Sequence, residues 1–179
     1  MELKEETIKK NVVYDGKIIR VRSDDVKCAN GNLCKREVVE HPGGVGIALE
    51  DHDGKFFMVK QFRYGQQEVM LEYPAGKKEC GEDALKCAKR EIVEETGYEA
   101  TDWVYLGHLA PTPAYCEERI DMYYAKVKDF KGQHFDDDEN IVVEKYSLDE
   151  LISMIMQQKI SDAKTVAMTF MVAQLKKEA

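Results

Sequence analysis

The sequence predicts a mixed α/β (α+β) domain preceded by a short β extension. Short strand-like runs such as VGIAL and RIDMYYAKV recur through the middle of the chain, and three segments carry helical spacing or helix caps. Strands mixed with a few helices are typical of a sheet packed against helices. A chain of 179 residues is also long enough for one domain with a substantial core.

The N-terminal extension is expected to cover residues 1–42. β-branched or alternating runs surround two turn signals, Asp15-Gly16 and Asn30-Gly31, so we expect strands joined by turns. The piece has too few apolar residues for a good core of its own, and we expect it to pack against the rest of the chain or a second copy. The Pro42-Gly43-Gly44 run ends it, and residues 43–179 form the main domain.

The main domain is expected to begin with strands. The runs VGIAL, FFMVKQF, WVYLGHL, RIDMYYAKV and IVVEKY have strand character, and an Asp53-Gly54 turn separates the first two. Residues 81–96 have an apolar stripe at helical spacing, which predicts a helix. We expect Glu82 and Asp83 in its first turn and Gly97 just after its last turn.

Two further helices are expected near the C-terminus. Ser147 and Glu150 form a capping box before the apolar run LISMIM, and the third helix is expected over about residues 162–176. We expect the apolar side chains of both helices to join the core rather than an interface.

Composition argues against several classes of protein. Hydrophobic residues make up 44% and charged residues 34% of the chain, an ordinary globular mix. The formal net charge of −8 opposes non-specific binding to nucleic acid. We expect no secretory signal and no membrane span, because no sufficiently long apolar stretch is present. The five cysteines are scattered, so we expect reduced thiols, a cytoplasmic location, and neither a zinc site nor a disulfide framework.

Three glutamates stand out in the helix expected over residues 81–96. Glu91, Glu94 and Glu95 are spaced i, i+3, i+4, so their carboxylates project from one face. These like charges repel each other unless a hard divalent cation lies among the oxygens. For this pattern in isolation, the more frequent alternative is a solvated acidic face relieved by lysines and Arg90.

The surrounding segment favours the metal-binding alternative. The stretch GKKECGEDALKCAKREIVEETGY resembles the Nudix box, GX₅EX₇REUXEEXGU with U apolar or aromatic, at every specified position. The matching residues are Gly76, Glu82, Arg90, Glu91, Ile92, Glu94, Glu95, Gly97 and Tyr98. The resemblance implies a Nudix fold, in which a mixed β-sheet lies between helices and the box forms a loop–helix–loop.

The same resemblance implies a Mg²⁺-dependent hydrolase, with Mn²⁺ as an occasional substitute. Glu91, Glu95 and the carbonyl of Ala75 occupy the positions expected to bind the metal. Glu94 is a weaker ligand candidate and is placed with the catalytic residues. Arg90 is expected to hydrogen-bond the carboxylates and orient them.

Flanking segments resemble the ADP-ribose pyrophosphatase branch of this family. REVVEHPGG and VKQFRYGQQEVMLEYPAG carry the upstream likeness. Downstream, Pro113 matches a proline that the branch usually has within SPG, but this chain has TPA and so lacks the glycine. The implied reaction is hydrolysis of ADP-ribose to AMP and ribose 5-phosphate. The alternatives are another nucleoside diphosphate sugar, such as GDP-mannose or ADP-glucose, or a non-catalytic module that binds ADP-ribose.

The branch resemblance also implies the substrate-binding residues Arg36, Glu37, Arg63, Pro113 and Glu118. Arg63 suits a phosphate or the terminal ribose, because a guanidinium is permanently charged and bidentate. The alternative for the charged residues among them is an ordinary exposed side chain.

Two further implications concern the general base and the assembly. Glu139 closes the acidic run of residues 136–139, where related enzymes carry an acidic residue on a mobile loop, and it is the candidate base. The alternatives are Asp137 of the same run as the base, or a solvated acidic loop without a catalytic role. The N-terminal strands imply a domain-swapped homodimer with shared active sites. The expected partner is a small nucleotide, not nucleic acid or a membrane.

Overall fold

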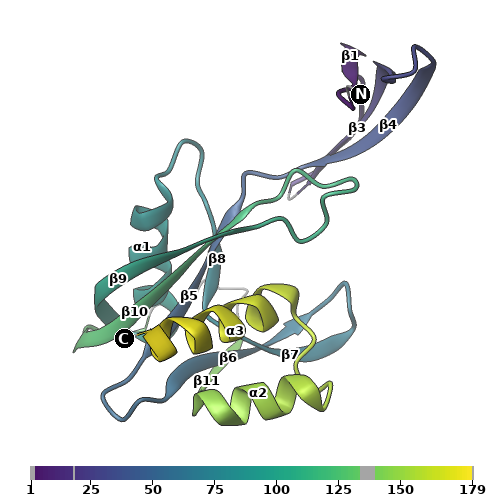
Figure 1. Cartoon of the computed structure of the whole chain (residues 1–179). Coiled ribbons are helices and arrows are strands. Elements are labelled where there is room, and N and C mark those ends of the chain that lie inside the picture. Colours follow the sequence, from purple (N-terminus) through teal and green to yellow (C-terminus); the bar gives the residue numbers. More distant parts are fainter. Residues whose placement is uncertain (1–2, 18, 134–139, 179) are drawn as a thin grey trace. The chain divides into compact units, whose positions relative to one another are not determined.

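The structure, a computed structural model, describes residues 3–17, 19–133 and 140–178 (Figure 1). The elements are β1 (Glu6–Lys9), β2 (Val12–Asp15), β3 (Arg20–Lys27), β4 (Leu33–Glu40), β5 (Gly44–Glu50), β6 (Phe56–Arg63), β7 (Glu68–Glu72), β8 (Ala75–Lys77), α1 (Ala84–Thr96), β9 (Tyr98–Leu109), β10 (Ile120–Phe130), β11 (Ile141–Tyr146), α2 (Leu148–Met156) and α3 (Ala163–Glu178).

The chain divides into two compact units. The first contains Met1–Gly43 and Ala110–Arg119, and the second contains Gly44–Leu109 and Ile120–Ala179. The predicted boundary assigns all of residues 43–179 to the main domain. The structure differs, because it groups the segment Ala110–Arg119 with the N-terminal strands.

The first unit is built on an antiparallel sheet in which β3 is central. β4 pairs with the full length of β3, while β1 and β2 pair with the two halves of β3. The segment Ala110–Arg119 attaches to β4 through Val39, whose N–H donates to the carbonyl of Tyr115 at 2.7 Å and whose carbonyl accepts from Glu117 at 2.9 Å.

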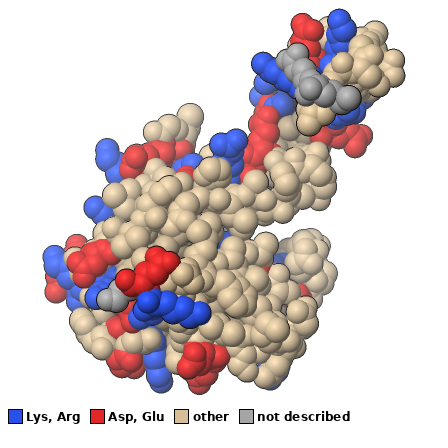
Figure 2. All heavy atoms as spheres, viewed as in Figure 1, with Lys and Arg blue, Asp and Glu red and all other residues tan. Residues whose placement is uncertain are grey.

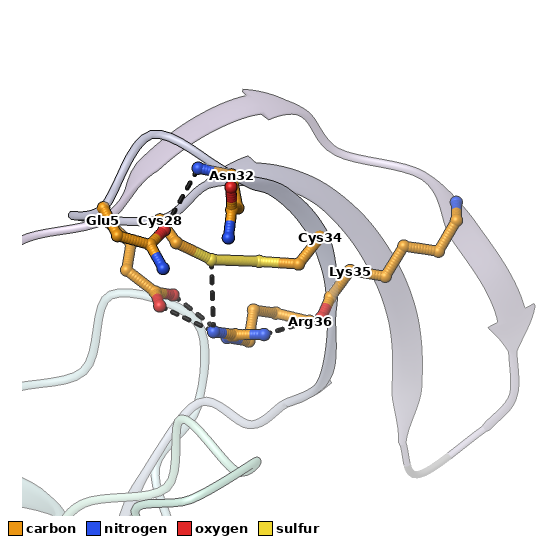
Figure 3. Close-up of a disulfide and its surroundings, with 7 residues drawn as sticks. Glu5, Cys28, Asn32, Cys34, Lys35 and Arg36 are labelled. Atoms are coloured by element: carbon orange, nitrogen blue, oxygen red, sulfur yellow. Dashed lines mark hydrogen bonds and ion pairs between the residues drawn. A yellow bond between two sulfur atoms is a disulfide. The ribbon is translucent and has the colours of Figure 1, made fainter.

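A disulfide joins Cys28 and Cys34 in this unit (Figure 3), so the expectation that every thiol is reduced is wrong. The sequence signalled the turn at Asn30-Gly31, and Gly31 has a φ of +88° there. The turn folds β4 back along β3, which brings the two cysteines together across the hairpin. Cys80, Cys87 and Cys116 carry free thiols.

The second unit contains a mixed sheet with the strand order β11-β6-β5-β10-β9, to which β7 adds on β6 and β8 on β5. β5 and β10 are parallel, and the other pairs are antiparallel. Every residue of β5 is buried, which explains its nearly continuous apolar sequence: a strand covered on both faces has no polar side.

Two apolar cores flank this sheet. Val45, Ile47 and Leu49 of β5 pack with Ile92 of α1 on one face. Ala48 belongs to the other core, which α2 and α3 cover. In Figure 1, α2 and α3 lie beside each other, apart from α1. A mixed sheet between helices confirms the predicted fold class.

The helix ends follow the sequence closely, with one correction. Gly97 ends α1 in the left-handed conformation with a φ of 78°, and the capping box of Ser147 and Glu150 begins α2, both as expected. However, α1 begins at Ala84, and its first turn contains no acidic residue. Asp83 is instead the N-cap and accepts from the N–H of Lys86 at 3.1 Å, because a short carboxylate caps well.

The described surface is electrostatically mixed. On the face seen in Figure 2, basic and acidic side chains are interspersed rather than gathered into a broad basic area. The formal net charge of the whole chain is −8. None of the helices that the structure describes is long and apolar enough to cross a membrane.

Candidate functional site

Helix α1 carries the three glutamates on one face, as their spacing predicts. Glu95 is only 4% exposed, and the side chain of Glu91 is 14% exposed. Glu94 is the outermost, with 41% of its side chain exposed. The site therefore has a buried end at Glu95 and a solvent-facing side at Glu94.

The backbone of β8 lies directly against the two inner glutamates. The N–H of Ala75 donates to Oε2 of Glu95 at 3.1 Å. A Cβ placed on Gly76 would lie 1.8 Å from Cδ of Glu91, so the carboxylate occupies the space that a side chain would fill. Pairing of Ala75 and Gly76 with β5 fixes this backbone in place. The structure thus places the backbone of Ala75 beside the side chain of Glu95, and Gly76 beside that of Glu91.

Arg90 ties these carboxylates together. Its Nη1 donates to Glu91 at 2.8 Å and to Glu94 at 2.9 Å. Nε and Nη2 donate to the two oxygens of Glu82 at 3.1 and 3.0 Å. These bonds lower the pKa of Glu82 to about 2 and raise the pKa of Arg90. Arg90 therefore has the geometry of the orienting residue that the sequence predicts.

The donor chemistry suits a hard cation. Across residues 3–17, 19–133 and 140–178, no group of three or more His, Cys, Asp or Glu side chains is arranged to hold a metal ion. The predicted set has only two carboxylates, and its third donor is a backbone carbonyl. Oxygen donors of these two kinds are those that Mg²⁺ and Mn²⁺ prefer. Glu91, Glu95 and the carbonyl of Ala75 could therefore hold such an ion.

Arg63 lies at the end of β6 in a network that the sequence did not predict. Its Nε and Nη2 donate to the two oxygens of Glu72 at 2.7 and 2.8 Å. Glu72 also accepts from Lys164 of α3, and Lys164 donates to Asp162 at 3.0 Å. The signal in the sequence was a glutamate flanked by Leu71 and Tyr73 in an apolar strand, where a charge needs a buried partner.

The other predicted substrate residues belong to the first unit. Arg36 donates to Glu5 at 2.6 Å, and its Nη2 lies 3.6 Å from Sγ of Cys28 (Figure 3). Glu37 is exposed on β4, and Pro113 is exposed in the segment Ala110–Arg119.

Glu118, from the same segment, lies with Oε1 3.6 Å from Nδ1 of His41. The first unit thus holds Arg36, Glu37, Pro113 and Glu118, whereas Arg63 belongs to the second unit. Glu139, the candidate base, and residues 136–138 lie outside the described residues.

Arg22 is a buried cation in the first unit that the sequence analysis missed. Its side chain is 6% exposed and donates to Asp24 at 3.1 Å, to Glu40, and to Glu117 at 3.0 Å. The hydrogen bonds that Arg22 donates to Glu117 and Glu40 raise the pKa of Arg22. Since Glu117 belongs to the segment with Pro113, Arg22 fixes that segment to the N-terminal strands.

Comparison with known proteins assigns the family. The family model described as the NUDIX domain matches residues 40–168. The chain is 38% identical over 164 residues to a methanol dehydrogenase activator from Bacillus methanolicus, covering 90% of this chain and 89% of that protein. It is 34% identical over 165 residues to an ADP-ribose pyrophosphatase from Bacillus subtilis (strain 168), covering 91% of this chain and 89% of that protein.

The fold comparison agrees with the family model. The crystal structure of an ADP compounds hydrolase matches with a TM-score of 0.86 and 19% identity, covering 99% of this chain and 97% of that chain. Likeness at that identity concerns the fold alone, and it confirms the fold that the sequence implied. From the box geometry, the family model and the relatives together, the chain belongs to the NUDIX family.

Proposed function

We propose that the chain hydrolyses the pyrophosphate bond of ADP-ribose, adding water across P–O–P to give AMP and ribose 5-phosphate. The observation that carries the proposal is the arrangement of the box: Arg90 holds Glu91 and Glu94 while Ala75 and Gly76 pack against Glu91 and Glu95. The relative from Bacillus subtilis (strain 168) named as an ADP-ribose pyrophosphatase covers 91% of this chain and supports the choice of substrate.

We propose Mg²⁺ as the cofactor, with Mn²⁺ as a substitute, bound by Glu91, Glu95 and the carbonyl of Ala75. Divalent ions at such a site neutralise the pyrophosphate and activate a water molecule. The chain itself contributes orientation: Arg90 fixes the position of Glu91, and the N–H of Ala75 fixes that of Glu95. Glu139 remains our candidate for the residue that takes the proton.

The experiment follows phosphate release through an added phosphatase, which cleaves AMP and ribose 5-phosphate but not intact ADP-ribose. The panel contains ADP-ribose, ADP-glucose, GDP-mannose, NADH and dinucleoside polyphosphates, each with Mg²⁺ and with EDTA. We expect Mg²⁺-dependent release with a clear preference for ADP-ribose. A preference for GDP-mannose would show that the substrate is that nucleotide sugar and not ADP-ribose. The absence of phosphate release from every compound, with either Mg²⁺ or Mn²⁺, would favour a non-catalytic module that binds ADP-ribose.

A second candidate function rests on the relative at 38% identity, which is named for activating a methanol dehydrogenase. If this chain acts in that way, its addition raises the rate of the dehydrogenase. The Glu95→Gln variant separates the two functions. An effect on the dehydrogenase that survives in a variant without hydrolysis would mean that activation does not need the box.

We also propose a homodimer with shared active sites. The described part of the extension exposes large apolar side chains that a monomer would leave in water: Leu3, Ile8, Val12, Val13, Tyr14, Ile19 and Leu33. Apolar surface of this kind marks interaction sites, and a symmetric dimer is the commonest oligomer. Sedimentation at micromolar concentration should give a dimer, and a monomer there would contradict the shared site.

A cytoplasmic location is our proposal for the compartment, supported by the nucleotide substrate. The disulfide between Cys28 and Cys34 argues the other way, because disulfides rarely persist in a reducing cytoplasm. Trapping the thiols in intact cells with an alkylating agent tests this. A cytoplasmic enzyme should have both cysteines alkylated, and full protection of the pair would contradict the location.

A further inference from the structure

We infer that Lys164, acting through Glu72, is a positioning residue that keeps Arg63 oriented and electrostatically available to the anionic substrate. The inference rests on the proposed function, since it concerns how that substrate is held. It assigns a role to two buried charged residues that lie outside the Nudix box.

Within the described part of the chain, the hydrogen bonds of the Arg63 guanidinium all go to one residue, Glu72. Two of its three guanidinium nitrogens are bonded to Glu72, at 2.7 Å from Nε and 2.8 Å from Nη2. Among the described residues, no hydrogen bond engages Nη1, and 40% of the side chain is exposed. A planar guanidinium held by two parallel bonds has a fixed orientation. The guanidinium of Arg63 is therefore held in place by Glu72, while its Nη1 takes no part in that pair.

Lys164 lies where a lysine is unfavourable unless it has a partner. It is 7% exposed and occupies the first turn of α3, whose N–H groups make that end positive and disfavour a cation. Asp162 caps this helix by accepting from the N–H of Thr165 at 2.9 Å. Lys164 reaches from the helix to both Asp162 and the buried Glu72. Its burial is thus explained by these two carboxylates.

The charges explain why Glu72 has two cationic partners. Without Lys164, the group of Arg63, Glu72 and Asp162 would sum to a formal charge of −1, and Arg63 would be the only cation paired with Glu72. With Lys164 the four charges sum to zero. Lys164 neutralises part of the negative charge of Glu72. The positive charge of Arg63 is then less fully cancelled by Glu72 and can attract the anionic substrate more strongly.

The network lies within electrostatic reach of the box. The bonds to Glu72 raise the pKa of Arg63, and the negative charge of Glu95 adds to the rise. Glu72 also ends β7 only three residues before Ala75, whose N–H holds Glu95. Arg63 therefore lies within the electrostatic field of Glu95, one of the carboxylates proposed to hold the metal ion.

The test is a double-mutant cycle with Lys164→Met and Arg63→Ala. For each protein, calorimetry in EDTA gives the Kd of ADP-ribose without metal, and the phosphatase-coupled assay with Mg²⁺ gives KM and kcat. We expect Lys164→Met to raise Kd and KM about tenfold with kcat changed less than about twofold. In the Arg63→Ala background, the same substitution should add nothing, because its effect passes through Arg63.

Lys176→Met is the matched control, since Lys176 also lies on α3 and pairs with a buried glutamate, Glu50. It should leave Kd and KM unchanged. Effects of Lys164→Met and Arg63→Ala that multiply, or an unchanged Kd for Lys164→Met, would overturn the inference. Should Lys164→Met not fold, the charge-balanced Glu72→Gln/Lys164→Met protein replaces it, and a wild-type Kd there would overturn the inference equally.

The two proposals fail in different ways. Wild-type protein that binds ADP-ribose without hydrolysing it would count against the proposed function alone, and the cycle in Kd would still decide the role of Lys164. Wild-type protein that neither binds nor hydrolyses ADP-ribose would overturn both.

Discussion

The carboxylate of Glu91 occupies the space beside Gly76 that any side chain would need. A Cβ at this glycine would lie 1.8 Å from Cδ and 2.2 Å from each oxygen of Glu91. The pairing of Gly76 with Val45 of β5 prevents the backbone from giving way. The first residue of the box is thus a glycine because even the Cβ of a larger residue has no room there. The loop that begins the motif and the glutamates of its helix form one site.

Gly76→Ala is therefore expected to displace Glu91 and to lower kcat at least a hundredfold, about 2.7 kcal/mol in barrier height. Thermal unfolding should change much less than activity, since the displaced carboxylate can turn toward solvent. The matched control is Gly65→Ala, because nothing lies within 4 Å of a Cβ at Gly65. Wild-type kcat in Gly76→Ala would refute the close packing of Gly76 and Glu91.

Glu95→Gln tests the assignment of a metal ligand at the buried end of the site. The amide keeps an oxygen for the N–H of Ala75 but loses the negative charge that would hold a divalent ion. We expect activity to fall at least a hundredfold while circular dichroism and the melting temperature stay close to wild type. Glu99→Gln, which removes a carboxylate that is 42% exposed, is the control. Unchanged turnover with normal Mg²⁺ dependence would remove Glu95 from the ligand set.

The sequence predicted the fold well because its signals are local. The spacing of Glu91, Glu94 and Glu95, the glycine after α1, and the capping box before α2 all concern residues within one turn of each other. The disulfide was not predicted because it depends on two features together: the turn at Asn30-Gly31 and the positions of Cys28 and Cys34 on the two sides of it. The turn at Asn30-Gly31 is a local signal, but the pairing also depends on the register of β3 and β4, which places Cys34 opposite Val26, two residues before Cys28.

The site was predictable only as far as the motif extends. Arg90 has a fixed place in the box, so its bonds to the carboxylates could be predicted from position, whereas the packing of Gly76 against Glu91 is seen only in the structure. Lys164 lies 92 residues from Glu72 along the chain, and Glu117 lies 95 residues from Arg22. No local pattern joins such pairs, because their contacts are created by the packing of a helix or a loop on distant strands.

Arg22→Met is expected to release the segment Ala110–Arg119 from the N-terminal strands. It would leave the buried Asp24 without its cation, and breaking a buried pair typically costs about 3 kcal/mol. Hydrogen exchange in that segment should become faster. Arg20→Met is the control, because the Arg20 side chain is 48% exposed and exposed pairs contribute little. Equal exchange rates in the two variants would refute the anchoring role.

The pair of Arg90 and Glu82 predicts a pH dependence of stability. The pKa of Glu82 falls from 4.5 to about 2 in the folded chain, so the ionised form stabilises the fold. Its contribution is complete above about pH 4.5 and is lost as the pH falls toward 2. The melting temperature of wild type minus that of Glu82→Gln should be constant from pH 7 to 5 and shrink below. A difference that stays constant down to pH 2 would contradict the lowered pKa.

The disulfide between Cys28 and Cys34 is expected to stabilise the folded chain. Cys28 and Cys34 are 6 residues apart, and closing so small a loop in the unfolded chain stabilises the fold by about 2 kcal/mol. Dithiothreitol should therefore lower the melting temperature of the wild type, whereas Cys34→Ser should melt at one temperature with or without it. Denatured, unreduced protein should show three reactive thiols, those of Cys80, Cys87 and Cys116. Five reactive thiols in protein purified under air would show that the two cysteines do not pair.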